Sequence, residues 1–349
     1  MRQPLDPVEL AIELMRIDST TGREGDVMRL VHRRLEERGW SVSRIPVTDG
    51  RENILAKSVE EPLVTLSTHL DTVPPFIPPR LENGRLWGRG SCDAKGIAAA
   101  MWCAAERLRD SAVPVALLFV VGEEVSHDGA HAANLVPTSS RLLINGEPTE
   151  STLALGTKGA IRATVRVRGE AAHSAYPHLG RSAIDELVDM LHELRRKPLP
   201  SDAVLGETTI NVGTIEGGVA DNVIAPHASA RLAIRLVRPH DEILRLLRDW
   251  AGTRAELEIV AIVPPAHLNT VPGFPTSVVA FATDVPVLSN WGTPYLYGPG
   301  SVHVAHRDDE HIDVEELRGA VGRYVELVET AWTEEGKREA GIGKSRHTG

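Results

Sequence analysis

The sequence predicts an α/β fold in which helices flank a central, mostly parallel sheet, with a smaller α+β domain inserted into it. Three observations predict this fold. Continuous apolar runs at residues 63–68, 115–121 and 142–144 have the composition of strands that are buried on both faces. A helical segment at about residues 96–108 separates the first two runs, as in a βαβ unit. Between about residues 159 and 264, apolar and polar residues alternate instead, which is typical of strands with one solvated face.

Two helices are expected before the first buried strand. Asp6 can cap a helix that begins with Pro7, because its carboxylate can accept hydrogen bonds from free amides and proline suits the first helical position. A second helix is expected over about residues 25–38, ending at Gly39. Together with the buried strands, these helices form the first part of the main domain, residues 1–158.

The alternating segment is expected to form a domain of its own with an antiparallel sheet. Residues 161–168 and 230–237 alternate between apolar and mostly polar side chains, and helices fit at residues 183–195 and 242–250. Candidate metal-binding residues occur on both sides of this segment, so we interpret it as an insertion over residues 159–265. The main domain resumes at residues 266–333, and residues 334–349 are expected to be a loose polar tail.

The bulk composition restricts the class of protein. The chain has 349 residues, of which 42% are hydrophobic and 25% charged, as in ordinary soluble globular proteins. Its net charge of −10 argues against a nucleic-acid or anionic-membrane partner. We expect no membrane span and no signal peptide, since no stretch of 18 apolar residues and no apolar N-terminal segment occurs. Two cysteines without a CxxC spacing predict reduced thiols and a cytoplasmic location.

Polar side chains that can bind metal stand where the apolar runs end. The five candidate ligands are His69, Asp93, Glu124, Glu147 and His306. In an open α/β sheet, ligands bind beyond the carboxyl ends of the strands, so residues far apart in sequence can converge there. Two imidazoles and three carboxylates suit a pair of divalent cations.

Two further acidic residues stand beside these candidates. If the chain stays extended after His69, Asp71 points to the same side and can orient the imidazole. Glu123 and Glu124 are adjacent after a buried strand, where their repulsion raises a pKa unless cations compensate. A solvated turn is the alternative for this pair. Glu123 would supply the carboxylate that moves a proton.

Two assignments stay open at this point. Asp93 follows a GxG segment, but the third glycine of a dinucleotide-binding pattern is missing and an aspartate would oppose a phosphate. It can instead bridge two cations, or simply cap the helix that begins near Lys95. Near the C-terminus, spacing alone does not choose between His303 and His306 as a ligand.

Taken together, these segments resemble the M20 family of di-zinc aminoacylases and peptidases. The resemblance extends from residue 6 to about residue 333. Within the family, the chain is most similar to acetylornithine deacetylases and to their desuccinylase and carrier-protein-lysine hydrolase relatives. The matching segments are HLDTVPP (69–75), GRGSCDAKG (88–96), VVGEE (120–124), INGEPTE (144–150), AAHSAYPHLGRSAID (171–185) and AHRDDEHI (305–312).

The resemblance implies a role for each matching residue of the metal centre. His69 and Glu147 would bind one cation, Glu124 and His306 would bind the other, and Asp93 would bridge the two. Asp71 would orient His69, and Glu123 would be the general base. Ala94 departs from the pattern, because the family often has a second acidic residue there.

The inserted segment resembles the family's dimerisation domain, which implies a homodimer. His173 matches a histidine that reaches into the partner subunit's active site, and Asn222 matches an asparagine that contacts substrate. Arg235 matches the arginine that binds the substrate carboxylate, although Arg231 lies on the same face of that strand, where a solvated arginine is the alternative. Lys158 is a further candidate on the substrate side.

The implied reaction is metal-dependent hydrolysis of the amide bond of an N-acyl amino acid, with N-acetylornithine as the expected substrate. Zinc is the expected metal, with cobalt or manganese as alternatives. Other substrates in the same class are a dipeptide, succinyl-diaminopimelate and the amide link of a carrier protein. A serine hydrolase is disfavoured because no GxSxG motif occurs. A non-catalytic relative is disfavoured because all five ligands and the base are present.

Overall fold

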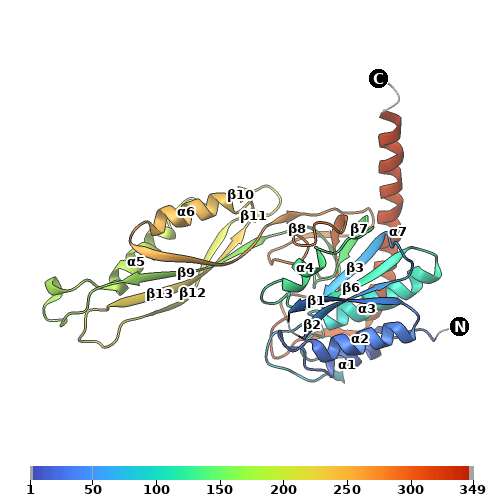
Figure 1. Cartoon of the computed structure of the whole chain (residues 1–349), viewed down its shortest axis with the longest axis horizontal. Coiled ribbons are helices and arrows are strands. Elements are labelled where there is room, and N and C mark those ends of the chain that lie inside the picture. Colours follow the sequence, from blue (N-terminus) through green and yellow to red (C-terminus); the bar gives the residue numbers. More distant parts are fainter. Residues whose placement is uncertain (1–2, 49, 346–349) are drawn as a thin grey trace. The chain divides into compact units, whose positions relative to one another are not determined.

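A computed structural model describes residues 3–48 and 50–345, with side chains described as far as residue 336. The chain forms two compact units (Figure 1). Unit 1 comprises residues 1–155, 268–277 and 283–349, apart from the residues outside the described ranges. Unit 2 comprises residues 156–267 and 278–282. The segment expected as an insertion, residues 159–265, falls inside unit 2.

Unit 1 contains a six-stranded sheet that is mostly parallel, which confirms the predicted fold class. In spatial order its strands are β1 (Ser41–Thr48), β2 (Arg51–Lys57), β6 (Val115–Val120), β3 (Val64–His69), β7 (Leu142–Asn145) and β17 (Thr293–Leu296). The four strands from β6 to β17 run parallel, whereas β1 and β2 form an antiparallel hairpin at one edge. The three apolar runs identified in the sequence are β3, β6 and β7, and all of their residues are buried.

Helices cover this sheet. They are α1 (Pro7–Met15), α2 (Gly25–Glu37), α3 (Lys95–Asp110), α4 (Asp128–Ala133) and α7 (Val314–Ser345). Asp6 caps α1 as expected, since its carboxylate accepts hydrogen bonds from the amides of Val8 at 2.8 Å and Glu9 at 3.1 Å. The helix predicted before Gly39 and the crossover helix between the first two buried strands also form.

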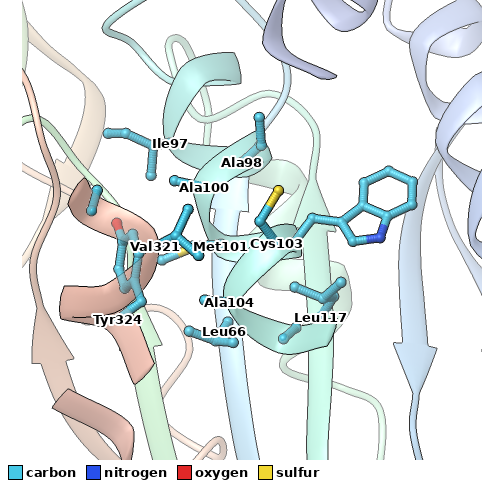
Figure 2. Close-up of a cluster of buried hydrophobic side chains, with 14 of the residues drawn as sticks. Leu66, Ile97, Ala98, Ala100, Met101, Cys103, Ala104, Leu117, Val321 and Tyr324 are labelled. Carbon is cyan, nitrogen blue, oxygen red and sulfur yellow. The ribbon is translucent and has the colours of Figure 1, made fainter. Parts of the chain in front are cut away.

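The core of unit 1 lies around α3, which packs between the sheet and α7 (Figure 2). Alanines dominate the buried surface of α3, so the helix backbone can approach the strands closely. Leu66 and Leu117 contribute from β3 and β6, and Val321 and Tyr324 contribute from α7. Burial of each such large side chain stabilises the fold by about 1.5–3 kcal/mol. The N-terminus of α3 and the ends of β3 and β6 are thereby held in fixed positions.

Two small sheets complete the connections. In unit 1, β18 (His311–Asp313), β5 (Arg85–Trp87) and β4 (Arg80–Glu82) form a three-stranded antiparallel sheet. Its pairing brings the chain just before His311 beside the glycine-rich segment after Trp87. The second small sheet joins β15 (Ala266–His267), β8 (Leu153–Thr157) and β16 (Thr276–Val279), where the chain passes from one unit to the other.

Unit 2 is an antiparallel sheet with helices on one face, as the alternating sequence predicts. Its strands are, in spatial order, β12 (Thr209–Gly217), β13 (His227–Leu236), β9 (Gly159–Arg168) and β14 (Ala255–Val263). The helices α5 (Ala183–Leu194) and α6 (Asp241–Ala251) pack on the apolar face of this sheet. Short elements η1 (Pro177–Leu179), β10 (Ser201–Asp202) and β11 (Gly206–Glu207) lie in the connections. Arg231 and Arg235 lie on the opposite face of β13.

The chain after Thr333 differs from the loose tail expected there. The helix α7 continues to Ser345, so most of residues 334–349 have helical backbone. Glu, Lys, Arg and Ala make up much of this stretch, and these are strong helix formers that extend a helix once it has begun. Within the described ranges, no helix combines the length and apolar character needed to cross a membrane.

Candidate active site

The candidate ligands of unit 1 meet at one edge of the sheet. His69 is the last residue of β3, Glu123 and Glu124 follow β6 closely, and Glu147 follows β7. The fourth parallel strand, β17, leads into the loop that carries His306. Since these four strands are parallel neighbours, their carboxyl ends lie side by side. Residues separated by more than two hundred positions in sequence therefore become neighbours, as the strand-end pattern predicts.

Asp93 lies between the two imidazoles. One of its carboxylate oxygens is 3.0 Å from His69 Nε2, and the other is 3.2 Å from His306 Nε2. His69 Nε2 is also 4.0 Å from Glu147, and His306 Nε2 is 3.0 Å from Glu124. The side chains thus form two groups that share Asp93. Of the two histidines that spacing left open, His306 is the one in contact with these acids.

The carboxylate of Asp71 contacts the end of β3 and the segment that follows β6. Its carboxylate lies 3.4 Å from His69 Nδ1 and accepts hydrogen bonds from the backbone amides of Glu123 at 3.1 Å and Glu124 at 3.2 Å. It also accepts a hydrogen bond from the Thr21 hydroxyl at 2.8 Å. Burial opposes the charge of Asp71, but these hydrogen bonds and His69 hold its pKa below the ordinary value. Asp71 therefore fixes both the imidazole and the backbone that carries the paired glutamates.

The three glutamates are crowded by like charge. The pKa values of Glu123 and Glu147 are raised well above the ordinary value, first by burial and then by neighbouring carboxylates. The pKa of Glu124 is also raised, mainly by burial. The pKa of His306 is raised to about 10 by its hydrogen bonds to Asp93 and Glu124. The acids attract any available positive charge.

This donor set fits divalent cations. Five carboxylates face only two imidazoles, so protonated histidines cannot neutralise the cluster when the acids ionise. Within the described residues, ligand atoms of His69, Glu123 and Glu147 lie within 4.8 Å of one another, as do those of His69, Asp93 and Glu124. Nitrogen and oxygen donors in this proportion suit zinc and similar ions.

Asp93 does not cap α3. The residue at the cap position is Ala94, and no side chain makes a capping hydrogen bond there. The carboxylate of Asp93 instead contacts His69 and His306. The capping alternative for Asp93 is therefore wrong, and its carboxylate lies between the two imidazoles instead.

Glu310 holds the loop that carries Asp93 and is not among the residues predicted from the sequence. One oxygen of this buried carboxylate accepts hydrogen bonds from the backbone amides of Gly90 at 2.9 Å, Cys92 at 3.2 Å and Asp93 at 3.2 Å. The other oxygen pairs with Arg89 at 2.7 Å. The amides of the glycine-rich loop thus serve an internal carboxylate, which explains why this GxG segment needs no phosphate. The only signal in the sequence was its place among the three acidic residues of AHRDDEHI.

Removing the Glu310 carboxylate is expected to destabilise the protein strongly. Glu310→Ala leaves the buried guanidinium of Arg89 unpaired, which costs about 3–5 kcal/mol in the free energy of unfolding. Glu315→Ala is the matched control, since its pair with Arg318 is exposed and its loss changes stability by less than about 1 kcal/mol. Denaturant unfolding of both variants measures the difference. Equal stabilities would show that the Asp93 loop does not depend on Glu310.

The candidate residues of unit 2 lie in two places. His173 and Asn222 are neighbours, because the amide of Ser174 donates to the Asn222 carbonyl at 3.0 Å and His173 pairs with Val223 in an isolated bridge. Both side chains are exposed. Arg235 lies opposite Ala160 on the neighbouring strand. Burial, and secondarily Arg162, lowers the pKa of Arg235.

The remaining substrate-side candidate, Lys158, has a partner within unit 2. Its Nζ donates to the carbonyl of Glu207 at 2.7 Å. Arg231, the alternative to Arg235, lies opposite Thr164 on β9 and Thr214 on β12. Both arginines therefore belong to the same polar sheet face.

Comparison with known proteins identifies the family. Residues 155–257 match the model of the peptidase dimerisation domain. A peptidase M20 domain-containing protein of Schizosaccharomyces pombe is 37% identical over 334 residues, covering 92% of this chain and 84% of that protein. The chain belongs to the M20 peptidase family. A probable carboxypeptidase of Aspergillus fumigatus is 38% identical to this M20 peptidase, with coverage of 91% of this chain and 85% of that protein.

Solved structures show the same fold at low sequence identity. A tripeptidase of Staphylococcus aureus has a TM-score of 0.77 and 20% identity to this M20 peptidase, covering 94% of this chain and 98% of that one. YXEP of Bacillus subtilis, described as a dinuclear metal-binding M20 peptidase, has a TM-score of 0.69 and 14% identity, covering 92% and 96%. These similarities confirm the predicted fold, an α/β domain with an inserted dimerisation domain.

Family membership confirms that the protein is a hydrolase acting on amide or peptide bonds. The finer resemblance to acetylornithine deacetylases is not what these relatives indicate, since they are described as carboxypeptidases and peptidases. The substrate of this M20 peptidase is therefore a peptide or an amino-acid derivative.

Proposed function

We propose that this M20 peptidase hydrolyses the amide bond next to a free α-carboxylate, using two divalent cations held in unit 1. The observation that carries the proposal is the convergence of two imidazoles and five carboxylates at the ends of four parallel strands, with Asp93 shared between the two groups. A carboxypeptidase, a dipeptidase and an N-acyl amino-acid deacylase all act on this class of bond.

The proposed ligands follow the two groups around Asp93. His69 and Glu147 would hold one cation, Glu124 and His306 would hold the other, and Asp93 would bind both. A pair of such cations supplies a polarised carbonyl and an acidified water at neutral pH. Zinc fits the donor set, and cobalt or manganese fits it as well. The dinuclear centre described for YXEP of Bacillus subtilis supports two ions rather than one.

Glu123 is the carboxylate left free to move a proton. Its backbone amide is held by Asp71, and its side chain lies beside His69 and Glu147 rather than in the shared Asp93 group. A general base there takes a proton from the attacking water and delivers it to the leaving amine. Burial, and next the Glu147 carboxylate, raise the pKa of Glu123 in the metal-free protein. Nearby cations would favour its ionised form, which can accept a proton.

The residues of unit 2 would recognise the rest of the substrate. Arg235 would bind the α-carboxylate through its two parallel N–H groups, which match a carboxylate in geometry. Asn222 and Lys158 would contact the same substrate. His173, from the partner subunit, would donate a hydrogen bond to the oxyanion that develops on the scissile carbonyl, a contact worth about 2.7–4 kcal/mol.

The proposed assembly is a homodimer formed through unit 2. The match to a peptidase dimerisation domain supports it, as do exposed apolar side chains on this unit. The most exposed are Tyr176, Leu179, Ile215, Val219 and Val260. The two cysteines are free and buried, in keeping with the reducing cytoplasm as the place where this dimer works.

A substrate panel tests the proposed class. The protein, saturated with zinc, cobalt or manganese, is incubated with dipeptides, tripeptides, N-acetylornithine and succinyl-diaminopimelate, and free amine is measured. Each substrate is paired with its α-carboxamide analogue. We expect hydrolysis of at least one free acid and much slower hydrolysis of its amide. The names of the relatives favour the peptides, whereas the deacetylase resemblance favours N-acetylornithine. Equal rates on acids and amides would contradict the requirement for a carboxylate.

Complementation between inactive variants tests the role of His173. We expect His173→Ala to form dimers and bind metal but to lose about 10²–10³-fold in kcat, because one oxyanion donor is missing. Mixing it with a Glu123→Gln variant should restore activity, since one site of each mixed dimer then has both groups. His178→Ala, an exposed histidine nearby, is the control. Absence of recovery in a verified mixed dimer would mean that His173 acts within its own chain or has no role.

A further inference from the structure

A histidine and an aspartate outside the proposed ligand set lie against Glu123. His127 Nδ1 is 2.8 Å from Asp284 Oδ1 and 3.7 Å from Glu123 Oε1. All three residues belong to unit 1, and their ligand atoms lie within 4.8 Å of one another. Neither His127 nor Asp284 is among the residues predicted from the sequence to have a role. Their nearness to the proposed general base is therefore a feature that the mechanism above does not use.

The backbone holds both residues in place. His127 stands just before α4 with a left-handed conformation, φ 53°, which is unusual for a residue with a side chain. Its amide donates to the Gly122 carbonyl at 2.8 Å, and its carbonyl accepts from His131 at 2.9 Å. Asp284 is almost fully buried, and its carbonyl accepts from the amides of the turn that follows it. The orientation of His127 is thus built into the fold.

The contact with Asp284 decides which ring nitrogen carries hydrogen. An ionised carboxylate only accepts hydrogen bonds, so His127 donates from Nδ1 to Asp284 at 2.8 Å. The same ring nitrogen lies 3.7 Å from Glu123 Oε1. The positive edge of the imidazole is then an attractive neighbour for a carboxylate that otherwise lies among Glu124, Glu147 and Asp284.

We propose that His127, oriented by Asp284, is a positioning residue that holds the Glu123 carboxylate in place for proton transfer. The proposal rests on the proposed role of Glu123 as general base. It predicts an effect on turnover and not on the binding of substrate or cations. A partner that orients a group in a metal site in this way typically changes activity by about 10–100-fold when it is removed.

Variants of His127 separate this role from a purely structural one. In the zinc-loaded enzyme, His127→Leu should lower kcat by about 10–100-fold with KM, dimer content and bound zinc unchanged. His127→Asn should retain most of the activity, because the asparagine amide can donate from nearly the same position as Nδ1. The matched control is His131→Leu, an exposed histidine on α4, which should leave kcat unchanged.

Two further combinations test the chain of contacts. Asp284→Asn should lower kcat, and the double variant Asp284→Asn with His127→Leu should be no slower than His127→Leu alone, since residues that act in series are not additive. In a Glu123→Gln background, His127→Leu should have no further effect on the residual rate. If His127→Leu does not fold, the kcat values of His127→Asn and Asp284→Asn relative to the wild type still test the proposal.

Several outcomes would overturn the proposal. Unchanged kcat in His127→Leu would show that Glu123 needs no such support. Loss of zinc from His127→Leu or Asp284→Asn, measured by elemental analysis, would instead identify the three residues as a further cation site. If Glu123→Gln is inactive and His127→Leu is fully active, the proposed function stands. Only the proposed role of His127 is then contradicted. A wild-type enzyme that is inactive on every substrate with every metal removes both.

Discussion

Replacing Glu123 by glutamine should lower kcat by about 10²–10⁴-fold, the usual effect of removing a general base, while two cations stay bound. Glutamine keeps the size of the side chain and cannot accept a proton. The proposed cation ligands are His69, Asp93, Glu124, Glu147 and His306, so Glu123→Gln should not change metal content. Steady-state kinetics and elemental analysis of the same preparation measure both quantities.

A matched variant makes the result specific. Glu52→Gln changes a partly exposed glutamate on β2 that pairs with Arg44 at 3.5 Å, and it should leave kcat unaltered. A variant Glu123→Gln with near wild-type turnover would remove this residue from the mechanism. Loss of one cation from Glu123→Gln would mean that Glu123 is a ligand, and the proton would then need another acceptor.

Removal of the metal is the second change with a large expected effect. Dialysis against a chelator should abolish activity, and adding zinc back should restore it. Bound ions also stabilise the fold, by about 4 kcal/mol when the free ion is at a thousand times its dissociation constant. Thermal unfolding with and without zinc measures this difference. Activity that survives complete removal of metal, checked by elemental analysis, would contradict the proposed chemistry.

The metal-free protein should become less stable as the pH rises from about 6.5 to 8. The pKa of His306 is raised to about 10, so its stabilising contribution is complete below 6.5 and is lost as the pH rises through 10. Glu123 and Glu147, whose pKa values are raised above 4.5, act in the same direction, because the folded state holds their protons more tightly than the unfolded state does.

The pKa of Lys95 sets the upper limit of this pH range. Burial lowers the pKa of Lys95 to about 8, so that group adds stability as the pH rises from 8 towards 10.5 and opposes the trend there. In excess zinc the trend between 6.5 and 8 should reverse, since ligands must lose their protons to bind the ion. Melting temperatures at both pH values, with and without zinc, check the two signs. The same slope in both conditions would contradict cation binding by these residues.

The sequence was sufficient for the parts of the fold that have strong local signals. The buried strands β3, β6 and β7 were predictable because continuous apolar runs of that length suit a parallel sheet. The hairpin of β1 and β2 was not predicted, since β1 is largely solvated and its residues have mixed polarity. In unit 2, β12 was missed for the same reason, as few of its side chains are buried.

Some residues of the candidate site were likewise predictable from the sequence, and others were not. The strand-end acids and histidines were predictable because topology brings carboxyl ends of parallel strands together. Glu310 and Asp284 were not, since each reaches its partner across the fold from a loop with no distinctive local pattern. Their roles depend on distances that only the tertiary structure supplies. Local sequence therefore indicated the candidate ligands and the candidate base, but not the residues that hold them in place.

Because unit 2 is inserted into unit 1, the proposed cation ligands are synthesised in two stages. His69, Asp93, Glu124 and Glu147 are all translated before residue 156, whereas β17 and His306 emerge only after unit 2 has been made. A nascent chain at that stage has the ligands proposed for one ion but lacks the imidazole of the other. The proposed pair of cation sites can therefore be completed only after unit 2 has been synthesised.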